Sequence, residues 1–261
     1  MNAQGHIIKD QVGGHPVLGI RGLTVSYGAE PAVFSVDLDI SPETMTAIVG
    51  PNGAGKSTML KAAMDIIPRL SGQISWFGGS LKNNRDAVAY VPQRASIDWD
   101  FPATVQDVVM MGLYSKLGLL GRIKRDHKAR VASALERVGM VDFAERQIGQ
   151  LSGGQQQRVF LARALVQDAD VYLLDEPFAG VDAATEKAII TVLKDLRSAG
   201  KTVVVVHHDL ATVPDYFDQV VLINKSIVAA GPTADVFTTD NLQAAYGGKL
   251  ATSQLDVMGL G

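Results

Sequence analysis

The chain has 261 residues, 47% of them hydrophobic and 20% charged, which is typical of a globular protein with a substantial buried core. Its net charge of −3 offers no basic field to nucleic acid, and the absence of cysteine excludes disulfides, thiolate metal ligands and cysteine nucleophiles. Because no apolar run reaches the roughly 18 residues that span a bilayer and the start lacks a signal peptide pattern, we expect a soluble chain.

The first elements expected are a tail and two strands. Residues 1–16 are broken up by glycine and proline and should form a flexible tail, with His6 and His15 exposed to solvent. The stretches "VLGIRGLTVSY" (17–27) and "AVFSVDLDI" (32–40) then alternate apolar and polar residues. This alternation predicts half-buried antiparallel strands.

A third strand, "MTAIV" (45–49), runs into the glycine-rich stretch "GPNGAGKS" (50–57), here called the phosphate loop. Its spacing, G-x-x-x-x-G-K-S, points loop amides and the start of the next helix at an anion, while the lysine adds a positive charge. The serine hydroxyl is placed to reach a magnesium ion. The sequence therefore predicts a nucleoside triphosphate site made of Gly50, Pro51, Asn52, Gly53, Ala54, Gly55, Lys56, Ser57 and Thr58.

The rest of the chain alternates strand-like and helical stretches. Further short runs rich in β-forming residues lie at 87–91, 171–175, 202–207 and 219–223. Most of them should be strands buried on both faces, as in a parallel sheet. Between the runs at 87–91 and 171–175, residues 104–114 and 124–141 have the periodicity of helices. The apolar stripe of the stretch 124–141 contains Val131, Ala134, Leu135 and Val138. A helical insert in an α/β core is expected. His127 within it should be exposed.

Two carboxylates follow the strand at 171–175. The stretch "VYLLDEP" brings Asp175 and Glu176 to the end of a buried strand, where ligands bind in open α/β sheets. Asp175 is expected to hold magnesium, usually through water, and Glu176 to orient or deprotonate a water that attacks the γ-phosphate. The alternative is a solvated acidic turn.

A second anion-binding helix start is predicted in "LSGGQQQRVFLARAL" (151–165). Ser152 is a good N-cap, and Gly153 and Gly154 let backbone amides approach an anion. A second such site is redundant within one chain unless it serves the nucleotide held by another subunit. L-S-G-G-Q-Q-Q-R, between a phosphate loop and a D-E strand, resembles the ATP-binding subunit of an ABC transporter. The resemblance covers about residues 18–248.

This resemblance implies a fold class. It is α/β, a P-loop NTPase (RecA-like) core with an antiparallel β subdomain and an inserted α-helical subdomain. A single ABC ATPase domain would cover 17–250, its core at about 17–93 and 158–250 and its helical insert at about 94–157. Residues 251–261 would form a C-terminal tail.

The resemblance also assigns further site residues. Tyr27 matches the aromatic residue that stacks on adenine, and Gln93 the glutamine that reaches magnesium and water. Asp182 matches the aspartate at the dimer interface, although the preceding "AGV" departs mildly from the family pattern. Of the two histidines in "VVVVHHDL", His208 matches the γ-phosphate histidine. The same pattern leaves His207 as a packing neighbour. The two histidines should not serve one metal ion, since adjacent strand residues point to opposite faces.

The resemblance is strongest to the manganese, zinc and iron branch of ABC importers, and it includes the stretch "DWDFP" (98–102). The aromatic residues of this stretch, Trp99 and Phe101, either dock against a membrane partner or pack the insert onto the core. The resemblance implies ATP and Mg²⁺, a homodimer, membrane permease subunits, an external metal-binding protein and no nucleic acid. It places the chain peripherally on the cytoplasmic face of the inner membrane. The alternatives are an ABC ATPase for another solute and a soluble non-transport ABC ATPase.

Overall fold

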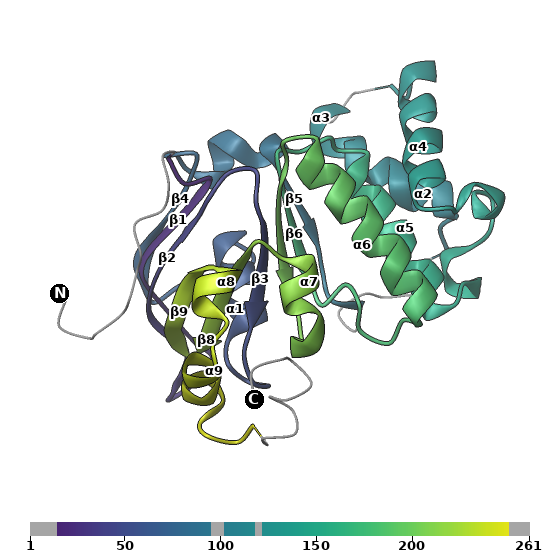
Figure 1. Cartoon of the computed structure of the whole chain (residues 1–261). Helices are drawn as coiled ribbons and strands as arrows, with labels where there is room; N and C mark the ends of the chain where they lie inside the picture. The colour runs from purple at the N-terminus through teal and green to yellow at the C-terminus, as the bar shows by residue number, and fades with distance from the viewer. Residues whose placement is uncertain (1–14, 95–101, 118–121, 251–261) are drawn as a thin grey trace. The chain divides into compact units, whose positions relative to one another are not determined.

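The computed structural model describes residues 15–94, 102–117 and 122–250. The chain forms two compact units, unit 1 of residues 1–85 and 202–261 and unit 2 of residues 86–201. Figure 1 shows the helices and strands of both. The expected boundaries of core and helical insert, at 93–94 and 157–158, differ from those of the units and stay a prediction.

Unit 1 contains two groups of strands. Its elements are β1 (Leu18–Ser26), β2 (Pro31–Ile40), β3 (Met45–Val49), α1 (Lys56–Ala63), β4 (Ser71–Trp76), β7 (Thr202–Val206), α7 (Val213–Tyr216), β8 (Gln219–Asn224), β9 (Ser226–Pro232), α8 (Thr233–Val236) and α9 (Thr239–Tyr246). In the first group β1 pairs antiparallel with β2 and with β4. In the second, β3 runs parallel to both β7 and β8, and β9 pairs antiparallel with β8. The antiparallel pair expected near the N-terminus is confirmed.

The central strands of unit 1 are buried at every position, as their composition predicts. β3 (MTAIV) and β7 (TVVVV) consist of apolar and β-branched side chains, and every residue in both strands is buried. Such strands pack on both faces of a sheet. This burial fixes the end of β3, from which the phosphate loop starts.

β4 and β9 lie where the sequence analysis expects no strand. The alternation of β4 is weak, and only its last residue, Trp76, is buried. The Trp76 indole is fully buried, and its Nε1 donates to the carbonyl of Ala63 at 3.0 Å. This hydrogen bond ties the end of β4 to the last residue of α1. β4 is therefore held by its pairing with β1 and by the burial of Trp76, and no periodic pattern in its sequence indicates it.

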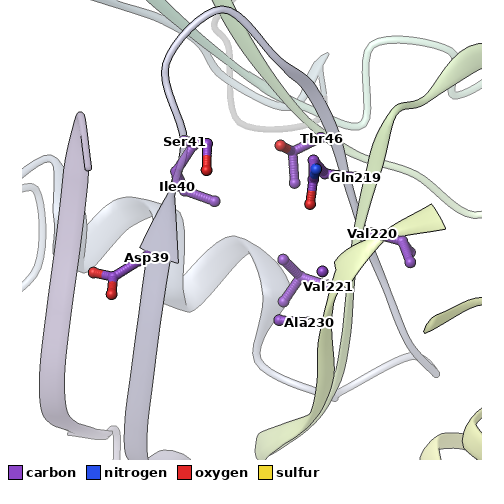
Figure 2. Close-up of a pocket in the computed structure, with 9 residues that line it drawn as sticks. Asp39, Ile40, Ser41, Thr46, Gln219, Val220, Val221 and Ala230 are labelled. Atoms are coloured by element: carbon purple, nitrogen blue, oxygen red, sulfur yellow. The ribbon is translucent and has the colours of Figure 1, made fainter. Parts of the chain in front are cut away.

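A small cavity of about 10 Å³ lies where the end of β2 meets β3, β8 and β9. Figure 2 shows Ile40, Thr46 and Gln219 around it. Among the described residues Gln219 Oε1 has no hydrogen-bond partner, although it is buried. None of the lining residues belongs to the predicted nucleotide site. The cavity is therefore separate from the predicted nucleotide site.

Unit 2 combines two strands with a group of helices. Its elements are β5 (Val88–Val91), α2 (Val105–Met110), α3 (Tyr114–Leu117), α4 (Arg125–Arg137), α5 (Gly153–Leu165), β6 (Val171–Asp175) and α6 (Ala183–Ser198). β5 and β6 are parallel. The helices α2, α4 and α5 pack against one another (Figure 1). The expected apolar stripe is confirmed, since Val131, Ala134, Leu135 and Val138 are all buried.

The helices of the insert are shorter than the periodic stretches that predicted them. α2 ends at Met110, and a 3-10 turn at Met111–Leu113 follows it. Thr104 caps α2 through a capping box with Asp107. Within the described part of the chain, no helix has the length and apolar character needed to cross a membrane.

Candidate functional site

The phosphate loop follows β3 and is shaped by two glycines. A Cβ on Gly50 would lie 2.0 Å from the carbonyl oxygen of Ile223, so no side chain fits there. Gly55 has a φ of 92°, and its Cβ would lie 2.5 Å from the carbonyl oxygen of Ala32. Gly55 is also the N-cap of α1 and provides no side-chain acceptor. The first amides of α1 therefore have no side-chain cap and point where an anion can bind.

Lys56 is the first residue of α1 and is 5% exposed. Its Nζ donates to the carbonyl oxygens of Gly50 at 2.7 Å and Pro51 at 3.0 Å. The lysine charge is thus held over the loop by the loop's own carbonyl groups. A bound phosphate would offer the ammonium a stronger, charged acceptor in the same loop.

Tyr27 and Tyr246 lie near this loop in unit 1. Tyr27 is 68% exposed, and its hydroxyl is 3.5 Å from Thr58 Oγ1. Such an open ring is accessible to a base, and adenine stacking at Tyr27 stays a prediction. Burial raises the pKa of Tyr246 to about 12, and a hydrogen bond with the backbone of Gly50 acts in the opposite direction. Sequence reasoning missed Tyr246, since nothing in its neighbourhood in the sequence signals contact with a loop almost 200 residues earlier.

The two histidines differ in environment. β7 ends at Val206, so both histidines follow the strand, and the alternation argument against a shared metal ion does not apply to them. His207 is 3% exposed, and its Nε2 is 2.7 Å from Thr212 Oγ1. Burial lowers the pKa of His207 to about 4. His208 is exposed. The packing role of His207 agrees with this geometry, and the γ-phosphate role of His208 stays a prediction.

In unit 2, the strand β6 delivers Asp175 as its last residue. The Asp175 side chain is fully buried, and the Tyr90 hydroxyl donates to Oδ2 at 3.3 Å. Burial, followed by the nearby charge of Asp175, raises the pKa of Tyr90. The tyrosine therefore stays protonated and acts as a donor to the carboxylate. A buried carboxylate with a neutral donor suits a divalent cation, directly or through water.

Glu176 follows Asp175 and pairs with Gln93. Gln93 Nε2 donates to Glu176 Oε2 at 2.6 Å, and both side chains are half-buried. With the amide nitrogen facing the carboxylate, the amide oxygen is the end of Gln93 that can accept from water or contact a metal ion. Glu176 has a φ of 53°, which is uncommon for a residue with a side chain. Backbone strain of this kind is found at functional sites. It can direct a side chain to a position that a residue in regular backbone conformation would not reach.

Ser152, Gly153 and Gly154, here called the signature loop, start α5 as predicted. Ser152 Oγ accepts from the amide of Gln155 at 3.4 Å, and the Gln155 side chain accepts from the amide of Ser152 at 2.9 Å. This capping box satisfies two amides within the chain. Ser152 is exposed. The loop is therefore formed in a single chain and open on one side.

Asp182 has a role that sequence reasoning missed. It is exposed and caps α6, with Oδ1 accepting from the amide of Thr185 at 2.7 Å. This backbone hydrogen bond is the largest cause of a lowered pKa for Asp182. A Cβ on Gly154 would lie 3.1 Å from Thr185 Oγ1, so the turn that Asp182 caps packs on the signature loop. An aspartate directly before the first residue of a helical stretch is the sequence signal that could have indicated this N-cap.

Other predicted features lie outside the site or outside the described residues. The stretch at 98–102 and His6 fall on residues that the structure does not describe, except for Pro102. His15 is exposed as expected. His127 is half-buried, contrary to the expectation, because its Nδ1 accepts from the amide of Lys124 at 3.1 Å at the start of α4. In the described ranges no three His, Cys, Asp or Glu side chains cluster in a way that could hold a metal ion.

The ABC transporter family model matches residues 33–179. The zinc transport system ATP-binding protein TroB of Treponema pallidum (strain Nichols) is 55% identical over 234 residues, 90% of this chain and 88% of the relative. The manganese transport system ATP-binding protein MntB of Bacillus subtilis (strain 168) is 54% identical over 231 residues, 88% and 92% of the two chains.

A solved structure, the ATP-binding cassette MJ0796 in a dimeric post-hydrolysis state bound to ADP and Pi, is 28% identical with a TM-score of 0.73. The match covers 82% of this chain and 98% of that one. The fold class is therefore confirmed as an α/β P-loop NTPase, and the resemblance deduced from the motifs is confirmed with it. The chain belongs to the ABC transporter family, as an ATP-binding subunit.

Proposed function

We propose that this chain hydrolyses ATP to drive uptake of a divalent transition metal through a separate membrane permease. Manganese is the first candidate, and zinc and ferrous iron are the next. The observation that carries the metal assignment is the identity of 54–55%, over about nine-tenths of the chain, with relatives named for manganese and zinc transport. The metal is cargo, and selectivity would reside in the permease and in an external capture protein.

ATP hydrolysis is supported by the groups described in each unit. Unit 1 provides the phosphate loop with the Lys56 ammonium, and unit 2 provides the Gln93–Glu176 pair. Glu176 would accept the proton of the attacking water, and Gln93 would orient that water through its amide oxygen. His208 would contact the γ-phosphate, and Tyr27 would stack on adenine.

Mg²⁺ fits the donors that these residues offer. Ser57, Gln93 and Asp175 supply hydroxyl, amide and carboxylate oxygens, the hard ligands that Mg²⁺ takes in phosphoryl-transfer sites. When bound, Mg²⁺ would neutralise charge that develops on the β- and γ-phosphate oxygens. The Asp175 carboxylate is buried at the end of β6 and accepts from the neutral Tyr90 hydroxyl, and it would contribute a negative charge to such an ion.

The active unit would be a head-to-tail homodimer. Each ATP would lie between the phosphate loop of one copy and the signature loop of the other, with Asp182 at the interface. The support is the exposure of Ser152 and Asp182 and the similarity to a cassette solved as a dimer. Peripheral attachment to the cytoplasmic face of the inner membrane, through the permease, follows from this proposal.

Mixed dimers test the head-to-tail arrangement. Chains with Lys56→Ala damage the phosphate loop, and chains with Ser152→Arg block the signature loop. A mixed dimer keeps one intact composite site, so mixing the two inactive variants should restore part of the hydrolysis. Dimerisation of Ser152→Arg alone, induced by ATP to the wild-type extent, would show that the signature loop does not bind the partner's nucleotide.

Elemental analysis tests the cargo. A strain without this chain should contain less manganese when manganese is scarce, and added manganese should restore its growth. A strain carrying Glu176→Gln in place of the wild-type chain is the matched control, since it retains the protein but not the turnover. Unchanged manganese, zinc and iron together with a fall in another solute would refute the metal assignment and leave the ATPase proposal standing.

A further inference from the structure

The side chain of Arg94, which directly follows Gln93, lies on the signature loop of the same unit. Its Nε donates to Gln156 Oε1 at 2.9 Å. Gln156 is 3% exposed, and its Nε2 donates in turn to the carbonyl of Ile148 at 3.3 Å. The acceptor that Arg94 uses is therefore a buried side chain on α5 that is itself held in place.

The rest of the guanidinium lies against Gly153. A Cβ on Gly153 would lie 3.2 Å from Arg94 Cζ and 3.4 Å from both Nε and one terminal nitrogen. The first of these distances is tighter than an ordinary van der Waals contact, so a methyl group at position 153 would require the guanidinium to shift by a few tenths of an ångström. Glycine at 153 thus makes room for a flat cation over the start of α5.

These contacts form a continuous path through unit 2. Glu176 accepts from Gln93, the next residue is Arg94, and the guanidinium joins Gln156 and Gly153. We propose that Arg94 is a positioning residue that fixes the signature loop relative to the Gln93–Glu176 pair. The inference rests on the proposed function, in which that pair acts on the chain's own ATP and the signature loop binds the partner's ATP.

The chemistry of the contact favours arginine at this position. A guanidinium is planar and carries five N–H donors in a fixed fork, so Nε can bond Gln156 while the flat face covers Gly153. A lysine ammonium keeps the charge but has no flat face and no second fixed donor. A role based on charge alone would therefore be retained in Arg94→Lys, whereas a positioning role would not.

The consequence is a coupling between the two ATP sites of a dimer. A change at Gln93 when the chain's own γ-phosphate leaves would reach Gly153 through one backbone step and one side chain. The signature loop would then loosen its hold on the partner's ATP. Without Arg94 each chain should still bind ATP through its phosphate loop, but ATP should hold the two chains together less tightly.

The test uses Glu176→Gln as the background, in which ATP should accumulate the dimer because hydrolysis is blocked. Sedimentation at saturating Mg-ATP measures the dimer dissociation constant, and a fluorescent ATP analogue measures binding to the dilute single chain. Arg94→Met should weaken the dimer about tenfold, which corresponds to about 1.4 kcal/mol. Binding of the analogue should stay unchanged, a split that a general loss of structure would not give.

Arg130→Met is the matched control. Arg130 Nη2 donates to the carbonyl of Val166 at 2.9 Å, at the C-terminal end of the same helix. Both variants remove one cation that anchors α5, but only Arg94 lies at its signature end. Arg130→Met should leave the dimer constant within about twofold, and Arg94→Lys should lie close to Arg94→Met.

Each other outcome overturns the inference. Equal dimer constants for Arg94→Met and Arg130→Met would show no special role for Arg94, and full rescue by Arg94→Lys would show that charge alone suffices. A thermal midpoint lower for Arg94→Met than for Arg130→Met would assign the side chain to stability. If the Glu176→Gln background forms no dimer with ATP at all, the proposed function fails and the inference fails with it.

Discussion

The phosphate loop of unit 1 and the signature loop of unit 2 both open a helix with glycine, yet they satisfy their backbone groups differently. The N-cap of α1 is Gly55, which has no side-chain acceptor, so no side chain caps the first amides of α1 and an anion can bind there. The N-cap of α5 is Ser152, which forms a capping box with Gln155. The first loop is built to be completed by its ligand, whereas the second is complete in the single chain.

The largest expected effect distinguishes ATP binding by the phosphate loop of unit 1 from ATP hydrolysis by Glu176 of unit 2. Glu176→Gln should lower ATP turnover by about 100- to 10,000-fold, the usual contribution of a general base, while ATP affinity persists. Lys56→Ala should instead weaken ATP binding, because the loop loses its charged donor. Turnover and nucleotide affinity, measured on both variants, check this division. Wild-type turnover in Glu176→Gln would exclude Glu176 as the base.

A second effect concerns the histidines after β7 and depends on pH. The folded pKa of His207 is about 4 and the ordinary value is 6.5, chiefly because of burial, while Asp209 and His208 act in opposite directions. Below pH 6.5 the unfolded chain binds a proton that the folded chain does not, so the free energy of unfolding falls as the pH decreases toward 4. The difference between these two pKa values corresponds to about 3 kcal/mol in the free energy of unfolding.

Urea unfolding between pH 7 and pH 4.5 measures this effect. His207→Gln should flatten the pH dependence relative to wild type, because the group that gains a proton on unfolding is gone. His208→Gln is the control, and it should keep the slope while lowering ATP turnover. A slope that disappears in His208→Gln and persists in His207→Gln would reverse the assignment of the two histidines.

The third prediction compares how much the stability of the chain depends on glycine at two positions of the phosphate loop. Gly50→Ala should destabilise the chain by about 1–3 kcal/mol or more, since the new methyl would overlap the Ile223 carbonyl. Gly53→Ala is the matched change, because Gly53 has a φ of 80° with no atom within 4 Å of a built Cβ. It should cost only about 1 kcal/mol, from the left-handed backbone. Equal losses in thermal unfolding would show that crowding at Ile223 is relieved by a backbone shift.

The smallest effect sharpens the comparison at the signature loop. Ser152→Ala and Asp182→Ala each remove an N-cap and should lower the free energy of unfolding by about 1 kcal/mol. If the signature loop also binds the partner's nucleotide, Ser152→Ala should weaken ATP-driven dimerisation beyond this loss of stability. Sedimentation with and without ATP distinguishes the two contributions. A dimer as tight as that of wild type would leave Ser152 with the capping role alone.

The elements and residues that local sequence signals describe well were predictable. The buried strands β3 and β7, the stripe on α4 and the cap at Ser152 each follow from composition or spacing within one element. β4 was missed because its burial depends on Trp76 meeting the end of α1. Arg94 and Tyr246 were missed for the same reason, since each acts on a glycine distant in sequence.

Two assignments went beyond spacing within one element. Glycine spacing predicted the phosphate loop, whereas the assignment of the signature loop to the partner's nucleotide was argued from redundancy and stays a proposal. The choice between the adjacent histidines came from the family pattern, because β7 ends at Val206 and strand alternation does not extend to them. Physical reasoning from one sequence is therefore most reliable within an element and least reliable at the ends of elements.

The cap at Ser152 also limits the directions in which its hydroxyl proton can point. A hydroxyl has one hydrogen to give and lone pairs to receive, and Ser152 Oγ already receives from the amide of Gln155. The hydrogen is thus left for a partner outside the helix, such as a phosphate oxygen. Aspartate caps helices at least as well as serine, but it has no proton to give and would bring a negative charge. Selection for a stable helix and selection for a working nucleotide site would therefore choose different residues at position 152.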